Sequence, residues 1–297
     1  MKRLTLLPIL SCLLTALFCL PLTATAKGGY KSVSAGGGYV MVLKEDGTLW
    51  GWGSNKSGQL GDGTTTKRER PVKILDGVKQ FSTVNDHTMA ILNDGSLWGW
   101  GSNGAGQLGD GATTNGQRPV KVLDGVKQVS VGGNYTMAIL NDGSLWGWGG
   151  NAFGMLGDGT TFVRTRPVKI LDGVRQVSTG GFHTMAILND GSLWDWGDNS
   201  NGQLGDGTKI NRTRPVKILD GVKQVSAGVY HTMAILNDGS LWGWGNNTFG
   251  QLGDGSTTDR TRPVKIADKV KDVACRDFYT IYITEDGELM ECGYKVW

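Results

Sequence analysis

A ten-residue string recurs along this chain at a constant interval. LNDGSLWGWG occupies residues 92–101, 140–149 and 236–245, and close variants occupy 43–53 and 188–197. The first tryptophans of the copies lie 48 residues apart, at Trp50, Trp98, Trp146, Trp194 and Trp242, and a degenerate sixth copy reads DGELMECG. A 48-residue period without insertions predicts that each copy is one structural unit packed against the next.

Each copy contains four short strand-like segments separated by turn residues. In residues 222–269 they are VKQVSA, HTMAIL, SLWGWG and PVKI. The NDG between the second and third segments is a strong hairpin signal, and the proline of the fourth suits an edge strand. The tryptophans of LWGWG share one strand face, so we expect them to pack between neighbouring sheets. Such sheets repeated around an axis predict an all-β fold, a β-propeller.

The number of copies predicts the number of blades. Six hairpins favour six blades, with seven as the alternative, and only five RPVK segments leave the last blade with three strands. We therefore expect the ring to close by packing between the first and last blades, at the weakest place in the ring. The repeats span approximately residues 30–77, 78–125, 126–173, 174–221, 222–269 and, in part, 270–297.

The N-terminus has the pattern of a secretory signal peptide. Lys2 and Arg3 precede an apolar run, and Ala24 and Ala26 form a small-residue cleavage site, so residues 1–26 are expected to be removed. An uncleaved membrane anchor is the competing interpretation. Residues 27–297 would then form a single propeller domain, secreted or periplasmic. Their 28 basic and 27 acidic residues predict no nucleic-acid partner, and no membrane association follows cleavage.

The repeat resembles that of the regulator of chromosome condensation family. The matching elements are histidine-threonine, aspartate-glycine, tryptophan-glycine-x-asparagine and glycine-glutamine-leucine-glycine, and the resemblance covers residues 31–293. It implies a propeller, commonly of seven blades, that binds proteins. Guanine-nucleotide exchange is one activity that the family implies, and inhibition of a secreted enzyme such as a β-lactamase is another. The chain departs from the family in its six hairpins and its signal peptide.

The polar residues of the repeat predict structural roles, and we expect no catalytic residue, cofactor or metal. One repeat position holds either histidine or tyrosine, which indicates a buried hydrogen-bonding strut. The GDG aspartates lack the alternating ligands of a calcium loop and indicate turns. Asp195 and Asp198 break the repeat together and are the acid pair that a secreted hydrolase or lyase, the alternative class, could use. The residues concerned are His87, His183, His231, Tyr39, Tyr135, Tyr279, Asp62, Asp110, Asp158, Asp206 and Asp254.

The loops at one end of the propeller are the expected binding face. Antiparallel strands place the loop between the first two strands at the same end as the long loop between the last two, and these loops vary between copies, as binding loops do. Aromatic side chains in them are typical of protein-binding hot spots, although each could instead tuck under its own loop. The predicted contacts to another, extracellular protein are Phe153, Phe162, Phe182, Tyr230, Phe249 and Phe278.

Two cysteines remain after signal cleavage, Cys275 and Cys292. Their repeat positions place them on a first and a third strand, with the second strand between them. Two strand spacings make about 10 Å, beyond the ~7 Å limit for Cα atoms joined by a disulfide. We therefore predict two free thiols.

Overall fold

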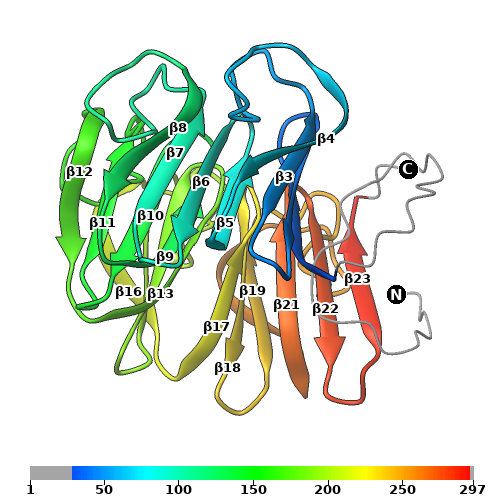
Figure 1. The fold of residues 1–297 in the computed structure, drawn as a ribbon. Coiled ribbons are helices and arrows are strands. Elements are labelled where there is room, and N and C mark those ends of the chain that lie inside the picture. The colour runs from blue at the N-terminus through cyan, green and yellow to red at the C-terminus, as the bar shows by residue number, and fades with distance from the viewer. Residues whose placement is uncertain (1–28, 295–297) are drawn as a thin grey trace.

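The computed structural model describes residues 29–294, so the expected signal peptide, residues 1–26, lies outside the described residues. Within 29–294 no helix is long and apolar enough to cross a membrane. In this described part of the chain, twenty-three strands form six antiparallel sheets, which are the blades of a propeller (Figure 1). The predicted fold class, six blades with a three-stranded last blade, is confirmed.

The strands of each blade follow one another in chain order. Blade 1 contains β1 (Tyr30–Ala35), β2 (Tyr39–Lys44), β3 (Leu49–Gly53) and β4 (Arg68–Leu75). Blade 2 contains β5 (Val78–Val84), β6 (His87–Leu92), β7 (Leu97–Gly101) and β8 (Gly116–Leu123). Blade 3 contains β9 (Val126–Val131), β10 (Tyr135–Leu140), β11 (Leu145–Gly149) and β12 (Arg164–Leu171).

The second half of the chain continues the same pattern. Blade 4 contains β13 (Val174–Thr179), β14 (His183–Leu188), β15 (Leu193–Gly197) and β16 (Arg212–Leu219). Blade 5 contains β17 (Val222–Ala227), β18 (His231–Leu236), β19 (Leu241–Gly245) and β20 (Arg260–Ala267). Blade 6 contains β21 (Val270–Arg276), β22 (Tyr279–Thr284) and β23 (Leu289–Gly293). The first strands of neighbouring blades contact one another, and the proline-containing fourth strand is an outer edge, as expected.

The NDG turns close the second hairpin of the regular blades. In blade 2, Gly95 has a φ of 83°, which favours glycine. Asp94 Oδ1 accepts hydrogen bonds from the amide and the hydroxyl of Ser96. Trp98 Nε1 in turn donates to Ser96 Oγ at 2.9 Å. The turn thus positions the first tryptophan of the strand that follows it.

In blades 2 to 5 the second tryptophan of the third strand fills the space between that blade and the preceding one. Trp100 is fully buried among Tyr39 and Met41 of blade 1, whereas Trp98 is half-buried at the border of the same cluster. The glycine between them serves the opposite interface, because a Cβ on Gly99 would lie 2.7 Å from the Met89 sulfur. The packing predicted from LWGWG is confirmed, with most of the burial on its second tryptophan.

Residues 29–294 form no such core at the seam between blade 6 and blade 1. The described residues form five buried hydrophobic clusters, one for each pair of consecutive blades from 1–2 to 5–6. Trp52 of blade 1 is half-buried where Trp100 is fully buried, and Ile283 of blade 6 is half-buried where Ile235 is fully buried. The expected closing contact between first and last blades is therefore not a buried apolar interface of residues 29–294.

The two cysteines are free, as predicted. Thr280 of the middle strand is the register partner of both Cys275 and Cys292 and so lies between them. The strand order therefore separates the thiols. Burial raises the pKa of each thiol to about 12.

Candidate functional site: an aromatic arc

Six aromatic side chains form a continuous series of ring contacts across blades 3 to 6, and we call this series the aromatic arc. Consecutive ring centroids lie 5.6, 6.2, 6.0, 5.3 and 5.1 Å apart. In order of contact its members are Phe153, Phe182, Tyr230, Phe278, Phe249 and Tyr294. The predicted meeting of short and long loops at one end of the propeller is confirmed, because Phe153 of a long loop touches Phe182 of a short one.

The short-loop members of the arc are held by backbone hydrogen bonds from the end of the third strand. The carbonyls of Phe182, Tyr230 and Phe278 accept from the amides of Asp198, Asn246 and Tyr294 at 2.9, 2.8 and 3.0 Å. This approach requires glycine at the strand end, since a Cβ on Gly245 would lie 2.6 Å from the Tyr230 carbonyl oxygen. The rings are thus presented on a rigid backbone.

The arc combines half-buried and exposed rings. Phe182, Tyr230 and Phe278 are half-buried by their mutual contacts. Phe153, Phe249 and Tyr294 are 39, 45 and 54% exposed and flank them. An array of this kind offers apolar area that is already ordered, so a partner that covers it loses little side-chain entropy there.

Five of the six sequence-predicted aromatic residues come together in the arc, and one does not. Phe162 is 71% exposed, and no ring contact found among residues 29–294 includes it. Tyr294 joins the arc although it is not among the predicted contacts. It follows the last strand, 48 residues after Asn246, so the repeat period itself could have placed it on this face.

The other half of the same face is polar. The short-loop position that holds Phe182, Tyr230 and Phe278 in blades 4 to 6 is occupied by Gly38, Asp86 and Asn134 in blades 1 to 3. The aromatic surface is therefore confined to one side of the loop face and stops where the short loops of blades 1 to 3 begin. This asymmetry arises from departures from the repeat, since a perfect repeat would give every blade the same loop.

The recurring histidine or tyrosine position is a buried strut in blades 1 to 5, as predicted, but not in blade 6, where Tyr279 is half-buried and donates to Glu291 of its own blade. His87, His183 and His231 are fully buried, and each Nε2 lies 2.9–3.2 Å from a threonine hydroxyl of the next blade. Burial lowers the pKa of His87 and His231 to about 4. These imidazoles connect blades and do not reach the loop surface.

The GDG aspartates organise their own loops. Asp206 Oδ1 accepts from the Thr208 amide, and its Oδ2 accepts from Arg212 Nε at 2.8 Å. Burial alone would raise the pKa of Asp206, but these hydrogen bonds outweigh it and lower the pKa. No group of three or more potential metal-ligating side chains occurs among residues 29–294. The turn interpretation of these aspartates is confirmed.

The repeat-breaking acid pair does not form a paired carboxylate site at the surface. Asp195 is fully buried in the glycine position of LWGWG, and neither carboxylate oxygen has a partner in good hydrogen-bonding geometry among residues 29–294. Burial raises its pKa well above the usual value, although the nearby Trp196 backbone N–H lowers it in part. Asp198 is 5% exposed and accepts hydrogen bonds from Gln203 and Ser200. Neither carboxylate is presented to a substrate in this arrangement.

Comparison with known families and structures agrees with this architecture. A family model described as the RCC1-like domain matches residues 15–296. The chain is similar to human WBSCR16, at 25% identity and a TM-score of 0.77 over 94% of this chain and 75% of that one. It is also similar to Prp20p of Saccharomyces cerevisiae, at 21% identity and a TM-score of 0.77 over 89% and 72% of the two chains. A comparison with curated proteins returns no match.

Proposed function

This chain belongs to the RCC1-like domain family of β-propellers, a common protein-binding scaffold, and we propose that it is an exported, non-enzymatic member that holds another protein on its aromatic arc. The observation that carries the proposal is the arc itself: six ordered rings in contact on the loop face of blades 3 to 6. Contiguous aromatic surface on a soluble fold marks an interaction site.

Three further observations support a protein partner. The repeated polar residues that could have served in catalysis have structural roles: the histidines, such as His87, hydrogen-bond to the next blade, and the GDG aspartates, such as Asp206, hold their own loops. The near-neutral charge of residues 27–297 gives no basic footprint for nucleic acid. Prp20p, which shares the fold, is described by its binding to Gsp1p and histones, so this scaffold serves protein recognition elsewhere. The signal-like N-terminus motivates the choice of an extracellular partner.

The test compares the mature chain with two variants as baits for proteins of the extracellular fraction. Replacing Phe182, Tyr230 and Phe278 together by alanine should weaken binding of the retained partner by about 2 kcal/mol or more, roughly thirtyfold. The matched control, Asp86→Ala with Asn134→Ala, alters the same loop position on the polar side and should bind like the parent. Circular dichroism checks that both variants fold.

Two results would reject this assignment. Equal affinity of the parent and the folded triple variant would place the binding face elsewhere. Turnover of a glycan or peptide by the purified chain would favour the hydrolase or lyase alternative. If the retained partner is itself a secreted enzyme such as a β-lactamase, its activity in the complex distinguishes an inhibitor from a passive scaffold.

A further inference from the structure

In blades 2 to 5 the fourth strand also covers the long loop of the preceding blade. The amides of Gly63, Gly111, Gly159 and Gly207 donate to the carbonyls of Gln117, Thr165, Thr213 and Thr261 at 2.8–2.9 Å. The next residue of each strand is the arginine of Arg-Pro, and its guanidinium packs directly on the same glycine, where an added Cβ would lie 2.5–2.6 Å from it. The long loop of each of blades 1 to 4 thus binds the extended Arg-Pro segment of the following blade.

A second glycine of each loop completes this contact. A Cβ on Gly202 would lie 2.9 Å from the Cα of Thr261, and Gly58, Gly106 and Gly154 meet their covering strands in the same way. The strand therefore lies flat on the loop, which only glycine at these positions permits.

The long loop of blade 5 shares the GQLGDG motif of blades 1, 2 and 4, but no strand of residues 29–294 lies over it. A Cβ on Gly255 would meet nothing within 4 Å, and one on Gly250 would meet only its own loop, at 3.8 Å from the Ser256 carbonyl oxygen. Within residues 29–294, β23 pairs with β22 alone, whereas β19 of blade 5 pairs with both β18 and β20. This loop and the strand edge beside it are therefore uncovered together.

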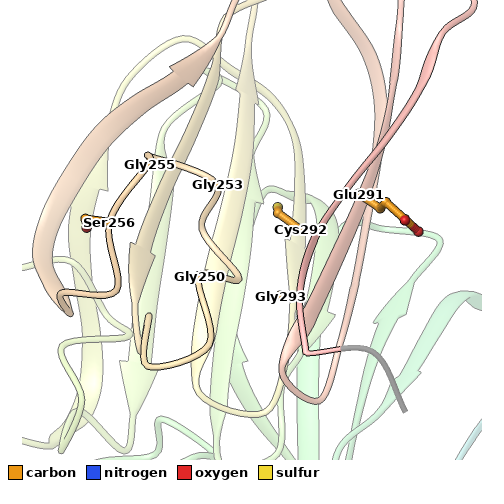
Figure 2. A pocket seen from close by; sticks show the side chains of 7 residues that line it. All are labelled: Gly250, Gly253, Gly255, Ser256, Glu291, Cys292 and Gly293. Atoms are coloured by element: carbon orange, nitrogen blue, oxygen red, sulfur yellow. The ribbon is translucent and has the colours of Figure 1, made fainter. Parts of the chain in front are cut away.

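A cavity of about 320 Å³ opens at this place, and Figure 2 shows the Cys292 side chain directed toward the loop. Its lining residues are Gly250, Gly253, Gly255, Ser256, Glu291, Cys292 and Gly293. Cys292 stands where blades 2 to 5 carry the buried second tryptophan, and its Sγ lies 3.3 Å from the Gln251 carbonyl, as Trp100 Nε1 lies 3.0 Å from that of Gln59. The neighbouring Glu291 side chain points away from the loop, and its Oε2 accepts a hydrogen bond from Tyr279.

We propose that β23 and the loop Gly250–Ser256, here called the acceptor edge, bind an extended Arg-Pro segment of another protein as a fourth strand of blade 6. The segment runs antiparallel to β23, the carbonyl before its arginine accepts from Gly255 N–H, and the guanidinium lies on Gly255. Strand addition of this kind obtains affinity from the backbone and specificity from alternate side chains. The geometry of this binding mode is taken from the long loops of blades 1 to 4, which the Arg-Pro strands of blades 2 to 5 cover.

A segment from another chain fits the acceptor edge better than residues of the same chain. The five Arg-Pro pairs of the sequence already form β4, β8, β12, β16 and β20, and residues 1–28 contain none. The acceptor edge also differs from the aromatic arc in chemistry, because it selects a backbone and a cation where the arc offers apolar rings. The two sites can therefore be tested separately.

The direct test uses a fluorescent peptide with the sequence of residues 212–219, RTRPVKIL, titrated into the full chain and followed by anisotropy. We expect saturable binding that weakens by about tenfold or more when the arginine before proline becomes alanine. Gly255→Asn should weaken it similarly, because its side chain occupies the guanidinium position, and asparagine tolerates the φ of 80°. The matched control is Gly287→Asn, with a φ of 82° and equally open surroundings, which should bind like the parent.

Hydrogen exchange gives an independent readout with an internal reference. The Gly255 amide should exchange rapidly in the free chain and become protected by the peptide, whereas the Gly207 amide, bonded to Thr261, stays protected throughout. Equal binding by Gly255→Asn and Gly287→Asn would overturn the proposal. Protection of the Gly255 amide without peptide would also overturn it, because the acceptor edge would then already be covered. Sedimentation would show whether a second copy of the chain covers it, seen as a dimer, or the chain's own N-terminal residues do.

Discussion

Asp195→Gly should stabilise the protein, and the gain should grow as the pH rises. The aspartate occupies a position that is glycine in blades 1, 2, 3 and 5. Its carboxylate is fully buried, and neither oxygen has a partner in good hydrogen-bonding geometry among residues 29–294. In the interface between blades 4 and 5, Trp244 Nε1 has no hydrogen-bond partner, unlike Trp148 Nε1, which donates to Gln107.

The magnitude follows from the burial of the acid. An unsatisfied buried polar group destabilises the fold by about 1–3 kcal/mol even when neutral. The glycine that replaces it destabilises the strand by roughly 0.5–1 kcal/mol, which reduces the net gain. Because burial raises the folded pKa of Asp195 above its unfolded value, the parent loses stability as the pH rises above about 4, by up to ~1.4 kcal/mol per pH unit, until the folded pKa is passed. We therefore expect a gain of about 1–2 kcal/mol near pH 3 and a larger one at pH 7.

Urea unfolding of both proteins at several pH values measures this difference. The matched control is Asp198→Gly, which removes a carboxylate that accepts hydrogen bonds from Gln203 and Ser200 and should yield no gain. A pH-independent difference between the parent and Asp195→Gly would refute the argument that the buried acid is the cause. A loss of stability in Asp195→Gly would show that the carboxyl is satisfied in the folded protein.

Three other predictions concern packing and the thiols. Trp148→Ala should lower the free energy of unfolding by about 3–5 kcal/mol, because Trp148 is fully buried between blades. Trp52→Ala should lower it by clearly less, because Trp52 is half-buried at the seam. Equal losses of unfolding free energy in chemical denaturation would contradict the weak packing at the seam. Cys292→Trp should raise the melting temperature, since burying about 100 Å² more apolar surface contributes about 2.5 kcal/mol; an unchanged or lower value would show that the cavity cannot accept the ring. Cys275 and Cys292 should alkylate slowly at pH 8 in the native protein and fully in denaturant, because burial raises both pKa values to about 12; a crosslinked mass without reductant would contradict the strand order.

The period of 48 residues determined everything that one blade shares with the next. Strand order, the NDG turns, the tryptophan interface and the histidine struts were predictable because each depends on contacts at a constant offset along the chain. His87 meets Thr136 and His183 meets Thr232 at the same separation of 49 residues. The separation of the two cysteines followed for the same reason, since strand order places Thr280 between them.

The candidate site could be predicted in part. Departures from the repeat pointed to Phe153, Phe182, Tyr230, Phe249 and Phe278, but not to their mutual contacts, which depend on how far adjacent loops lean together. Phe162 carries the same signal and lies outside the arc, whereas Tyr294 lies in the degenerate last repeat and belongs to it.

The tertiary structure alone decided how the six blades end. The angle between neighbouring blades is set by the packing of whole side-chain layers, so no single repeat encodes whether the last blade reaches the first. Trp52 and Ile283 are half-buried on either side of the seam, and no strand of residues 29–294 covers Gly255 as β20 covers Gly207. The sequence by itself determined the blade and its neighbour contacts, because those are local and repeated. The weakly packed seam and the acceptor edge depend on how all six blades pack together, which no single repeat encodes.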